Sequence, residues 1–256
     1  MSSETQIEAG AGRFAGQNVI VTGGTRGLGL AITTAFLKDG ATVHATYRSN
    51  KEAADAARES LAEAGDRLHL HGFDVSNYAQ VEEFWGSMDS VEGGIQVLVN
   101  NAGLRKDGIL ATMPESDWND VISTNLTGSF SMSKFAVLNM LRQRYGRIIL
   151  ITSPAGSFGF QGQCNYSASK AGQVGFMRAL CKEVAKRKIT VNCVSPGFID
   201  TELLEDLPDA LRKQYTDMVP MKRFGSAQDI AYAVQCLASK DASYITGTTL
   251  EVTGGL

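Results

Sequence analysis

The sequence predicts a doubly wound α/β domain, in which about seven parallel strands form one sheet with helices on both faces. Short runs of β-branched and apolar residues alternate with longer helical stretches along the chain. Repeated succession of strand, helix and strand requires crossover connections, which make neighbouring strands parallel. The runs are apolar at nearly every position, as expected for strands that helices cover on both faces. No low-complexity linker divides the chain, so a single domain is expected.

Each element follows from the local residue pattern. Strands are expected at 18–23, 42–47, 67–75, 95–101, 147–153, 189–196 and 249–252, and helices at 27–39, 51–64, 77–89, 114–141, 166–187 and 227–239. The helix at 114–141 has start signals, with Thr112 as its cap, Pro114 just inside and Glu115 three residues after the threonine.

Two segments fall outside this alternation of strands and helices. Residues 1–14 are expected to form a flexible tail that precedes one catalytic domain at 15–256. The segment at about 198–226 interrupts the pattern with a loop and a short helix, and it is expected to form a lid over a pocket.

Composition excludes several classes of function. The 256 residues are 43% apolar and 20% charged, which suffices for a full core, and the net charge of −3 provides no basic field of the kind that nucleic-acid binders use. No apolar run approaches the roughly 20 residues that cross a bilayer. The four cysteines lack metal-ligand spacing, and His69 and His71, on one strand face, lack a third ligand at a sensible spacing. We therefore expect reduced thiols, no metal site and a cytoplasmic protein.

A glycine-rich loop directly follows the first predicted strand. The stretch VTGGTRGLGLAI carries Gly23, Gly27 and Gly29 and opens the first predicted helix. Small residues there let backbone N–H groups approach a pyrophosphate at the helix N-terminus, where the helix dipole favours negative charge. The spacing is TGxxxGxG rather than GxGxxG, but its place in a βα chain predicts a Rossmann-like dinucleotide site.

The end of the second predicted strand indicates which dinucleotide binds. A site for NAD typically has an acidic residue there, which binds the ribose 2′-hydroxyl. This chain has TYRSN at 46–50 instead, with Arg48 in that stretch and Arg26 in the glycine loop. Guanidinium groups hold a phosphate in a planar, bidentate manner, so the pattern predicts NADP(H).

Three residues form a candidate catalytic centre where a strand gives way to a helix. Ser153 ends the strand expected at 147–153, and Tyr166 and Lys170 lie about one turn apart on the helix that follows, so they share a face. An ammonium near a phenol favours the phenolate, so the lysine is expected to lower the pKa of Tyr166 toward the working pH, as a general acid needs. Ser153 is expected to donate to a substrate carbonyl and to stabilise oxyanion charge.

Further motifs accompany these residues in order. NNAG at 100–103, Asn125 and SPG at 195–197 join the glycine loop, the serine and the YxxxK of 166–170. The set resembles the short-chain dehydrogenases/reductases over about 16–256, and within that family most resembles the bacterial 3-oxoacyl-[acyl-carrier-protein] reductases. The resemblance implies a catalytic set of Asn125, Ser153, Tyr166 and Lys170.

The resemblance also implies individual roles. Lys170 would bind the nicotinamide ribose, and Asn125 would hold a water in the proton relay, within a segment (123–129) whose β-branched, polar and glycine residues suggest a helix kink. Asn100 is expected to be structural. The full expected set of cofactor contacts is Gly23, Thr25, Arg26, Gly27, Leu28, Gly29, Arg48, Ser49, Asp74, Val75, Asn101, Ala102, Gly103, Tyr166, Lys170, Pro196, Gly197, Ile199 and Thr201.

The activity implied by the resemblance is NADPH-dependent reduction of a 3-oxoacyl thioester to the 3-hydroxyacyl thioester, as in fatty-acid biosynthesis. The sequence does not separate an acyl-carrier protein from coenzyme A as the carrier, and it leaves chain length, direction and stereochemistry open. Another ketone or secondary alcohol, such as a polyketide, sugar or steroid, is the alternative. A non-catalytic dinucleotide sensor is disfavoured because the tyrosine and the lysine are both present.

Partner surfaces are also implied. Arg144, with Arg142 and Arg147 nearby, and Arg187 match arginines that dock the acidic carrier protein in such reductases, although cations at helix ends also complement the dipole. The helices at 114–141 and 166–187 are expected to form the contact of a homotetramer. Pro154 and Cys164 depart from the family pattern near the pocket, and the chain stops at TGGL, a few residues short of the usual family end. The two substitutions are expected to alter acyl-chain fit, and the short end to weaken assembly.

Overall fold

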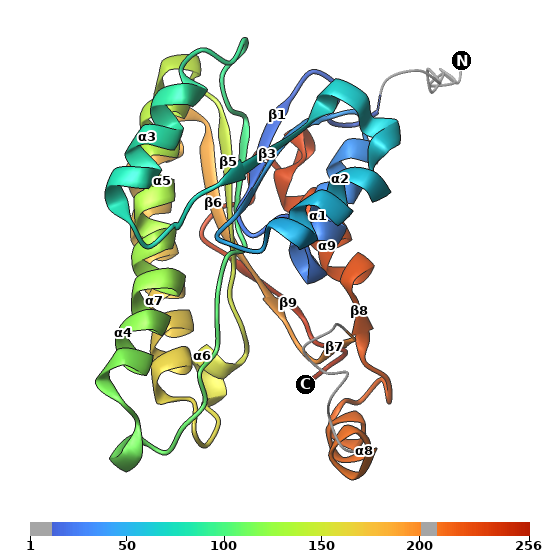
Figure 1. Ribbon diagram of the computed structural model, residues 1–256, viewed down its shortest axis with the longest axis vertical. Helices are drawn as coiled ribbons and strands as arrows, with labels where there is room; N and C mark the ends of the chain where they lie inside the picture. The colour runs from blue at the N-terminus through green and yellow to red at the C-terminus, as the bar shows by residue number, and fades with distance from the viewer. Residues whose placement is uncertain (1–11, 201–208) are drawn as a thin grey trace, which may run out of the picture.

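One seven-stranded parallel sheet runs through the protein, as Figure 1 shows, and it confirms the fold prediction. The computed structural model describes residues 12–200 and 209–256. The strand order is β3-β2-β1-β4-β5-β6-β9. Its strands are β1 Asn18–Val21, β2 Thr42–Tyr47, β3 Leu68–Gly72, β4 Val97–Asn100, β5 Gly146–Ile151, β6 Ile189–Pro196 and β9 Thr249–Val252, and a separate parallel pair is formed by β7 Ile199–Asp200 and β8 Gly225–Ser226.

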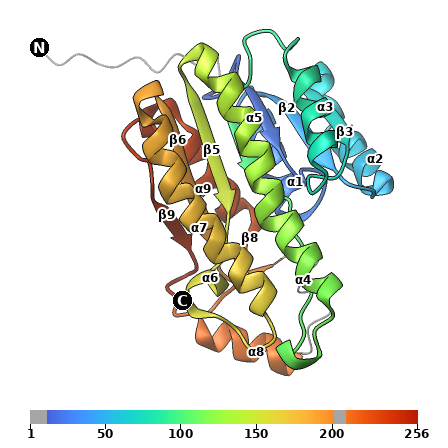
Figure 2. The same cartoon turned by 90° about the vertical axis from the view of Figure 1, so that its left-hand side faces the viewer.

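Helices cover both faces of the sheet (Figures 1 and 2). The first face is covered by α1 Gly27–Lys38, α2 Lys51–Ser60 and α9 Ala227–Ala238, and the second by α3 Tyr78–Met88, α5 Gly128–Gln143 and α7 Cys164–Val184. The remaining helices are α4 Glu115–Ile122, α6 Ala155–Phe158 and α8 Asp209–Met218. Within the described ranges, no helix combines the length and the apolar character that crossing a membrane requires.

The apolar character of the strands follows from their position between two helix layers. Val19 and Val21 of β1 pack into the core beneath α1 and α9, whereas Ile20 packs into the core beneath α3, α5 and α7. In β5, Ile149 packs into the core beneath α1 and α9, and Ile148 packs into the core beneath α3, α5 and α7. Successive side chains of a strand point to opposite faces, so every position of β5 and every position of β1 after Asn18 is buried.

The direction in which successive strands are added to the sheet reverses after β3. The first three strands build outward from β1 to the edge strand β3, and the chain then returns to pair β4 against the other side of β1. In an open parallel sheet, such a switch point leaves a crevice outside the carboxyl ends of the strands. The fold therefore places the glycine loop after β1 and the NNAG stretch after β4 side by side.

The helix expected at 114–141 is interrupted, as the composition of 123–129 suggested. Helix α4 ends at Ile122, a π-helical turn covers Ser123–Thr127, and α5 begins at Gly128. The expected cap is wrong, because Pro114 precedes the helix without a side-chain cap and the Thr112 hydroxyl donates to Ile109 O, 3.3 Å away.

The expected tail at 1–14 extends too far into the domain. Residues 1–11 lie outside the described residues, but Phe14 is fully buried and its ring centroid lies 4.8 Å from that of Phe36. Its aromatic ring belongs to the core beneath α1. Of the expected lid, 198–200 and 209–226 are described, and the lid role stays a prediction.

Candidate active site

A large cavity opens at the carboxyl ends of the central strands. Its volume is about 1050 Å³, and loops that follow β1 to β6 line it. Almost every residue expected to contact substrate or cofactor lies in this lining; these are Gly23, Thr25, Arg26, Gly27, Leu28, Gly29, Arg48, Ser49, Asp74, Val75, Asn101, Ala102, Gly103, Ser153, Tyr166, Lys170, Pro196, Gly197 and Ile199. Thr201 lies outside the described residues, and Asn125 lies behind the wall.

The glycine loop forms a cradle that side chains would fill. Gly23 and Gly27 have positive φ angles of 63° and 50°, which glycine adopts without strain. A Cβ on Gly29 would lie 1.9 Å from the carbonyl oxygen of Gly23, so the first turn of α1 packs directly against the loop. Gly24 also belongs to the cradle, although it was not among the expected site residues, because a Cβ there would lie 2.8 Å from Cβ of Ala45.

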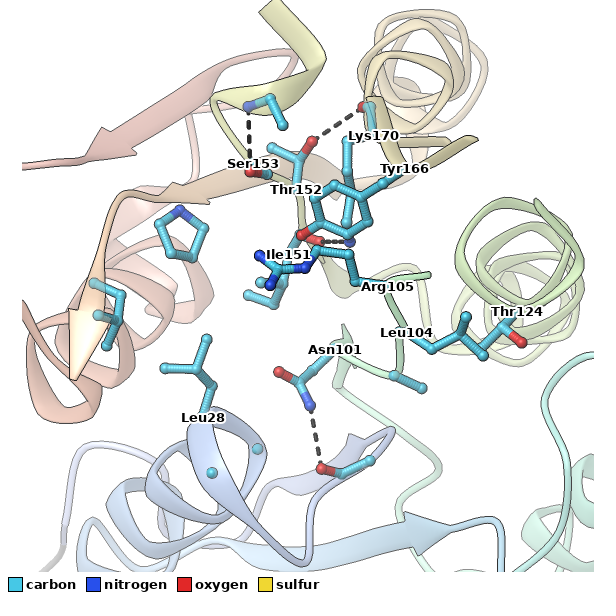
Figure 3. Close-up of a pocket in the computed structure, with 18 of the residues that line it drawn as sticks. Leu28, Asn101, Leu104, Arg105, Thr124, Ile151, Thr152, Ser153, Tyr166 and Lys170 are labelled. Atoms are coloured by element: carbon cyan, nitrogen blue, oxygen red, sulfur yellow. Dashed lines mark hydrogen bonds between the residues drawn. The ribbon is translucent and has the colours of Figure 1, made fainter. Parts of the chain in front are cut away.

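Asn101 ties the glycine loop to the loop after β4. Its Nδ2 donates to the carbonyl oxygens of Thr22 (2.9 Å) and Gly23 (3.1 Å), as Figure 3 draws in part. In return, the Thr22 hydroxyl accepts from the backbone N–H groups of Asn101 (3.0 Å) and Ala102 (2.9 Å). Thr22 is a second residue that sequence analysis missed, because its role depends on a segment about 80 residues away.

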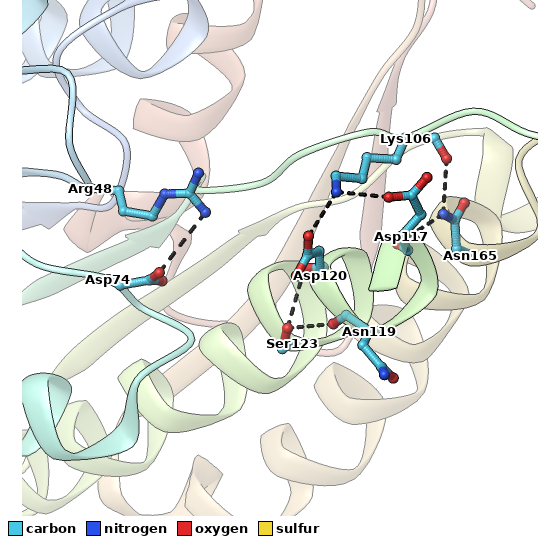
Figure 4. Close-up of polar contacts among 8 residues, drawn as sticks. All are labelled: Arg48, Asp74, Lys106, Asp117, Asn119, Asp120, Ser123 and Asn165. Atoms are coloured by element: carbon cyan, nitrogen blue, oxygen red, sulfur yellow. Dashed lines mark hydrogen bonds and ion pairs between the residues drawn. The ribbon is translucent and has the colours of Figure 1, made fainter. Parts of the chain in front are cut away.

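Two arginines stand at the end of the cavity next to β2. Arg26 is exposed at the N-terminus of α1, and Arg48 follows β2 with 59% of its side chain exposed. The Nη1 of Arg48 lies 3.9 Å from Oδ2 of Asp74, an ion pair at the limit of contact (Figure 4). So long and exposed a pair is weak, and it leaves the guanidinium free to bind an anion.

Ser153, Tyr166 and Lys170 meet on one wall of the cavity (Figure 3). Lys170 is 4% exposed, and its Nζ donates to Ile151 O at 2.8 Å and lies 5.5 Å from the centroid of the Tyr166 ring. The Thr152 hydroxyl donates to Lys170 O at 3.0 Å, which fixes the start of α7 against the end of β5. The three side chains are therefore held by the backbone junction between a strand and a helix.

The expected direction of the Tyr166 pKa shift is wrong for this structure. Burial raises the pKa of Tyr166 above its ordinary value, and the hydrogen bond with Ser153 and the positive charge of Arg105 oppose this effect. Lys170, whose Nζ donates to Ile151 O, is not among the causes. Burial also lowers the pKa of Lys170 to about 8.

A family model described as short chain dehydrogenase matches residues 17–212. The chain belongs to this family. It is therefore an oxidoreductase that uses a nicotinamide dinucleotide, NAD(H) or NADP(H). The match includes every strand of the seven-stranded sheet except β9, together with the glycine loop and the Ser-Tyr-Lys set.

Curated relatives resemble this short-chain dehydrogenase over nearly its whole length. The 3-oxoacyl-[acyl-carrier-protein] reductase FabG of Haemophilus influenzae is 46% identical over 241 residues, which are 94% of this chain and 98% of that protein. The protein of the same name from Escherichia coli is 43% identical over 243 residues, 95% and 98% of the two chains, and that from Vibrio harveyi is 44% identical over 241 residues, 94% and 97%.

Asn125 lies in the π-helical turn of the dehydrogenase and is fully buried. Its Oδ1 accepts from Leu104 N at 2.8 Å, while its Nδ2 donates to Leu104 O at 3.0 Å and to the Ser169 hydroxyl at 3.1 Å. A Cβ on Gly103 would lie 3.2 Å from Asn125 Oδ1. The side chain thus clamps the loop after β4 to α7, and its relay role stays a prediction.

The substrate side of the cavity contains residues that sequence analysis did not single out. They are Leu104, Arg105, Asp107, Phe160, Gln161, Gln163, Phe198 and Tyr215. They come from the loops after β4, β5 and β6 and from α8, so no local pattern groups them. Pro154 also lines the cavity, whereas Cys164 is exposed at the start of α7 and is not part of the lining.

Arg144 and Arg187 lie far from the catalytic wall within one chain. Both are exposed and precede β5 and β6, whose first residues pair as Gly146 and Ile189, so they lie at the amino edge of the sheet, opposite the cavity. Arg147 was expected beside them but is 2% exposed. Its guanidinium donates to backbone carbonyls, including Ser239 O at 3.1 Å.

Proposed function

We propose that this short-chain dehydrogenase reduces 3-oxoacyl thioesters to 3-hydroxyacyl thioesters with NADPH, as in fatty-acid biosynthesis in the cytoplasm. The observation that carries the proposal is the continuity of one cavity from the glycine loop to Ser153, Tyr166 and Lys170. Relatives at 43 to 46% identity that are named 3-oxoacyl-[acyl-carrier-protein] reductases support the substrate class.

A dinucleotide fits the residues of the cavity. The glycine cradle leaves room for a pyrophosphate next to the N-terminus of α1, where backbone N–H groups and the helix dipole favour anions. Beyond the cradle, the expected contacts from Asp74 to Ile199 follow the cavity toward the catalytic wall. When bound, the dinucleotide supplies the hydride that turns a ketone carbon into a secondary alcohol.

Arg26 and Arg48 favour NADPH over NADH. Both side chains line the cavity where β2 ends. The stretch TYRSN has no carboxylate that could bind a ribose 2′-hydroxyl and carries Arg48 instead. A guanidinium can leave its weak contact with Asp74 and hold a 2′-phosphate by two parallel hydrogen bonds.

The proton chemistry follows from the catalytic wall. A phenol with a raised pKa is protonated at neutral pH, so Tyr166 holds the proton that the reduced oxygen requires. The Ser153 hydroxyl can donate to the same oxygen and stabilise the charge that develops there. Lys170 lies on the same wall, with its Nζ 5.5 Å from the centroid of the Tyr166 ring, and its proposed role is to bind the nicotinamide ribose.

Carrier-protein docking at Arg144 and Arg187 requires more than one chain. The two arginines share the amino edge of the sheet and the cavity opens at the carboxyl edge, so an acyl chain delivered from a docked carrier would enter the cavity of another copy. A homotetramer in which α5 and α7 form the contact would supply that copy. Exposed Phe130 and Leu138 on α5 are consistent with such an interface.

The decisive experiment follows oxidation of NADPH and of NADH by absorbance at 340 nm with acetoacetyl-CoA, in wild type and Tyr166→Phe. We expect NADPH to be the better donor and the variant to lose at least about 100-fold in kcat. A matched control is Tyr232→Phe, because Tyr232 is an exposed tyrosine of α9 outside the cavity lining.

Two results would contradict the proposal. Equal turnover in wild type and Tyr166→Phe would show that Tyr166 is not the general acid. Turnover of other ketones without turnover of the thioester would support the alternative oxidoreductase. Charge reversal at Arg144 and Arg187 tests the carrier separately, because it should weaken reduction of carrier-bound substrate and leave the coenzyme A substrate unchanged.

A further inference from the structure

Arg105 is a cation on the substrate side of the cavity that the proton chemistry leaves unused. It comes two residues after the NNAG stretch and lines the cavity with Ser153 and Tyr166. Figure 3 shows its guanidinium directed toward the phenol of Tyr166. Its charge lowers the pKa of that phenol, against the larger effect of burial. A positive group therefore faces the place where a substrate oxygen has to lie.

The guanidinium retains donors for a ligand. Its Nε lies 3.3 Å from Oδ1 of Asp107, and the two side chains are 49% and 44% exposed, so this ion pair contributes little. Among the described residues, the two terminal amino groups of Arg105 have no hydrogen-bond partner. A guanidinium carries five N–H donors in a planar fork, of which at least four remain for a ligand.

The loop that carries the arginine is anchored by the two residues that follow it, Lys106 and Asp107. Lys106, the next residue, donates to Asp117 Oδ1 at 2.8 Å and to Asp120 Oδ2 at 2.7 Å, which ties the loop to α4 (Figure 4). Asp107 Oδ2 accepts from Nε2 of Gln163 at 3.2 Å, which ties the same loop to the residue before α7. The backbone of Arg105 is therefore held in place relative to the catalytic wall, while its side chain stays accessible.

We propose that Arg105 is a specificity-determining residue that donates to the second carbonyl oxygen of the substrate. The inference rests on the proposed function. The ketone oxygen lies on Ser153 and Tyr166, and in a 3-oxoacyl thioester one methylene separates the ketone carbon from the thioester carbon. The thioester oxygen can then face the same wall and accept from the guanidinium. A ketone without a neighbouring carbonyl leaves these donors unpaired, which discriminates against it.

The test compares two ligands that differ only in that oxygen. Acetoacetyl-CoA carries the thioester carbonyl, and S-(3-oxobutyl)-CoA is a thioether with the same ketone, the same coenzyme A and no second carbonyl. For Arg105→Gln, we expect kcat/KM with the thioester to fall about tenfold or more, and kcat/KM with the thioether to change by less than about twofold. Arg105→Lys keeps the charge without the planar fork and should fall between these values.

A matched control is Arg13→Gln. Arg13 also pairs with an aspartate, Asp39, at 3.3 Å, but it lies outside the cavity lining. The variant should therefore leave kcat/KM unchanged with both the thioester and the thioether. Equal losses with thioester and thioether in Arg105→Gln, or no loss with either, would overturn the inference.

A binding measurement separates this inference from the proposed function. Calorimetric titration of the NADP⁺-saturated protein with both coenzyme A compounds gives the ratio of their dissociation constants without turnover. If the wild type does not reduce the thioester, the proposed function fails, and a thioester preference that disappears in Arg105→Gln still supports the arginine. A ratio that is the same in wild type and variant, or no binding of either compound to the wild type, refutes it.

Discussion

A buried histidine makes the stability of this dehydrogenase depend on pH. His44 of β2 is 4% exposed, its Nδ1 lies 3.1 Å from Nε2 of His71, and its ring stacks on that of His69 with 4.7 Å between centroids. Burial, followed by the charges of these two neighbours, lowers the pKa of His44 from 6.5 to about 3. The folded protein therefore resists protonation of a group that the unfolded chain protonates readily.

The size of the effect follows from the two pKa values. Between pH 6.5 and 3 the unfolded chain binds more protons at this residue, so stability falls as pH falls through that window. One pKa unit corresponds to about 1.4 kcal/mol, which limits the whole effect to about 5 kcal/mol. Integrated from pH 7.5 to 5.0, His44 accounts for a loss of about 2 kcal/mol in the free energy of unfolding.

The assay is urea unfolding at pH 7.5 and 5.0, at one protein concentration, in wild type and His44→Gln. Trp85, which is buried next to Phe84, reports unfolding by its fluorescence. The variant should lose about 2 kcal/mol less than wild type between the two pH values. Burial also lowers the pKa of His71. This histidine is present in both proteins, so its contribution to the pH dependence largely cancels when they are compared.

The control distinguishes burial from charge as the cause. His69→Gln removes an exposed histidine of the same cluster and should keep most of the pH dependence, because burial is the first cause of the His44 shift. The same pH dependence in wild type and His44→Gln would refute the reasoning.

Two further predictions concern the dinucleotide site. Gly29→Ala should weaken NADPH binding by at least about tenfold in a fluorescence titration, because its Cβ would lie 1.9 Å from Gly23 O, whereas Gly86→Ala in α3, with open space around it, should bind normally and gain up to about 1 kcal/mol of stability. Arg48→Ala should raise KM for NADPH about tenfold and leave KM for NADH within about twofold, measured by initial rates. Equal effects on both donors would mean that Arg48 does not bind the 2′-phosphate.

The sequence by itself determined the elements that depend on local pattern. Apolar runs and helical stretches alternate over short windows, so their order and the parallel sheet could be predicted before any contact was known. The glycine loop and the spacing of Tyr166 and Lys170 could be predicted for the same reason. Each needs only neighbouring residues and the geometry of one turn or one helix face. An interruption near Ser123–Thr127, where the structure has a π-helical turn, could be predicted from a composition that suits a helix poorly.

Only the tertiary structure decided which polar groups are buried and what faces them. Phe14 belongs to the core because α1 lies against it, and Arg147 is structural because carbonyls near residues 188 and 239–240 surround its guanidinium. Burial raises the pKa of Tyr166, and Lys170, whose ammonium is directed at Ile151 O, is not among the causes of that shift. The guanidinium of Arg105 is directed toward the phenol of Tyr166 (Figure 3). These properties depend on burial and on partners distant in the chain, and no local pattern encodes them.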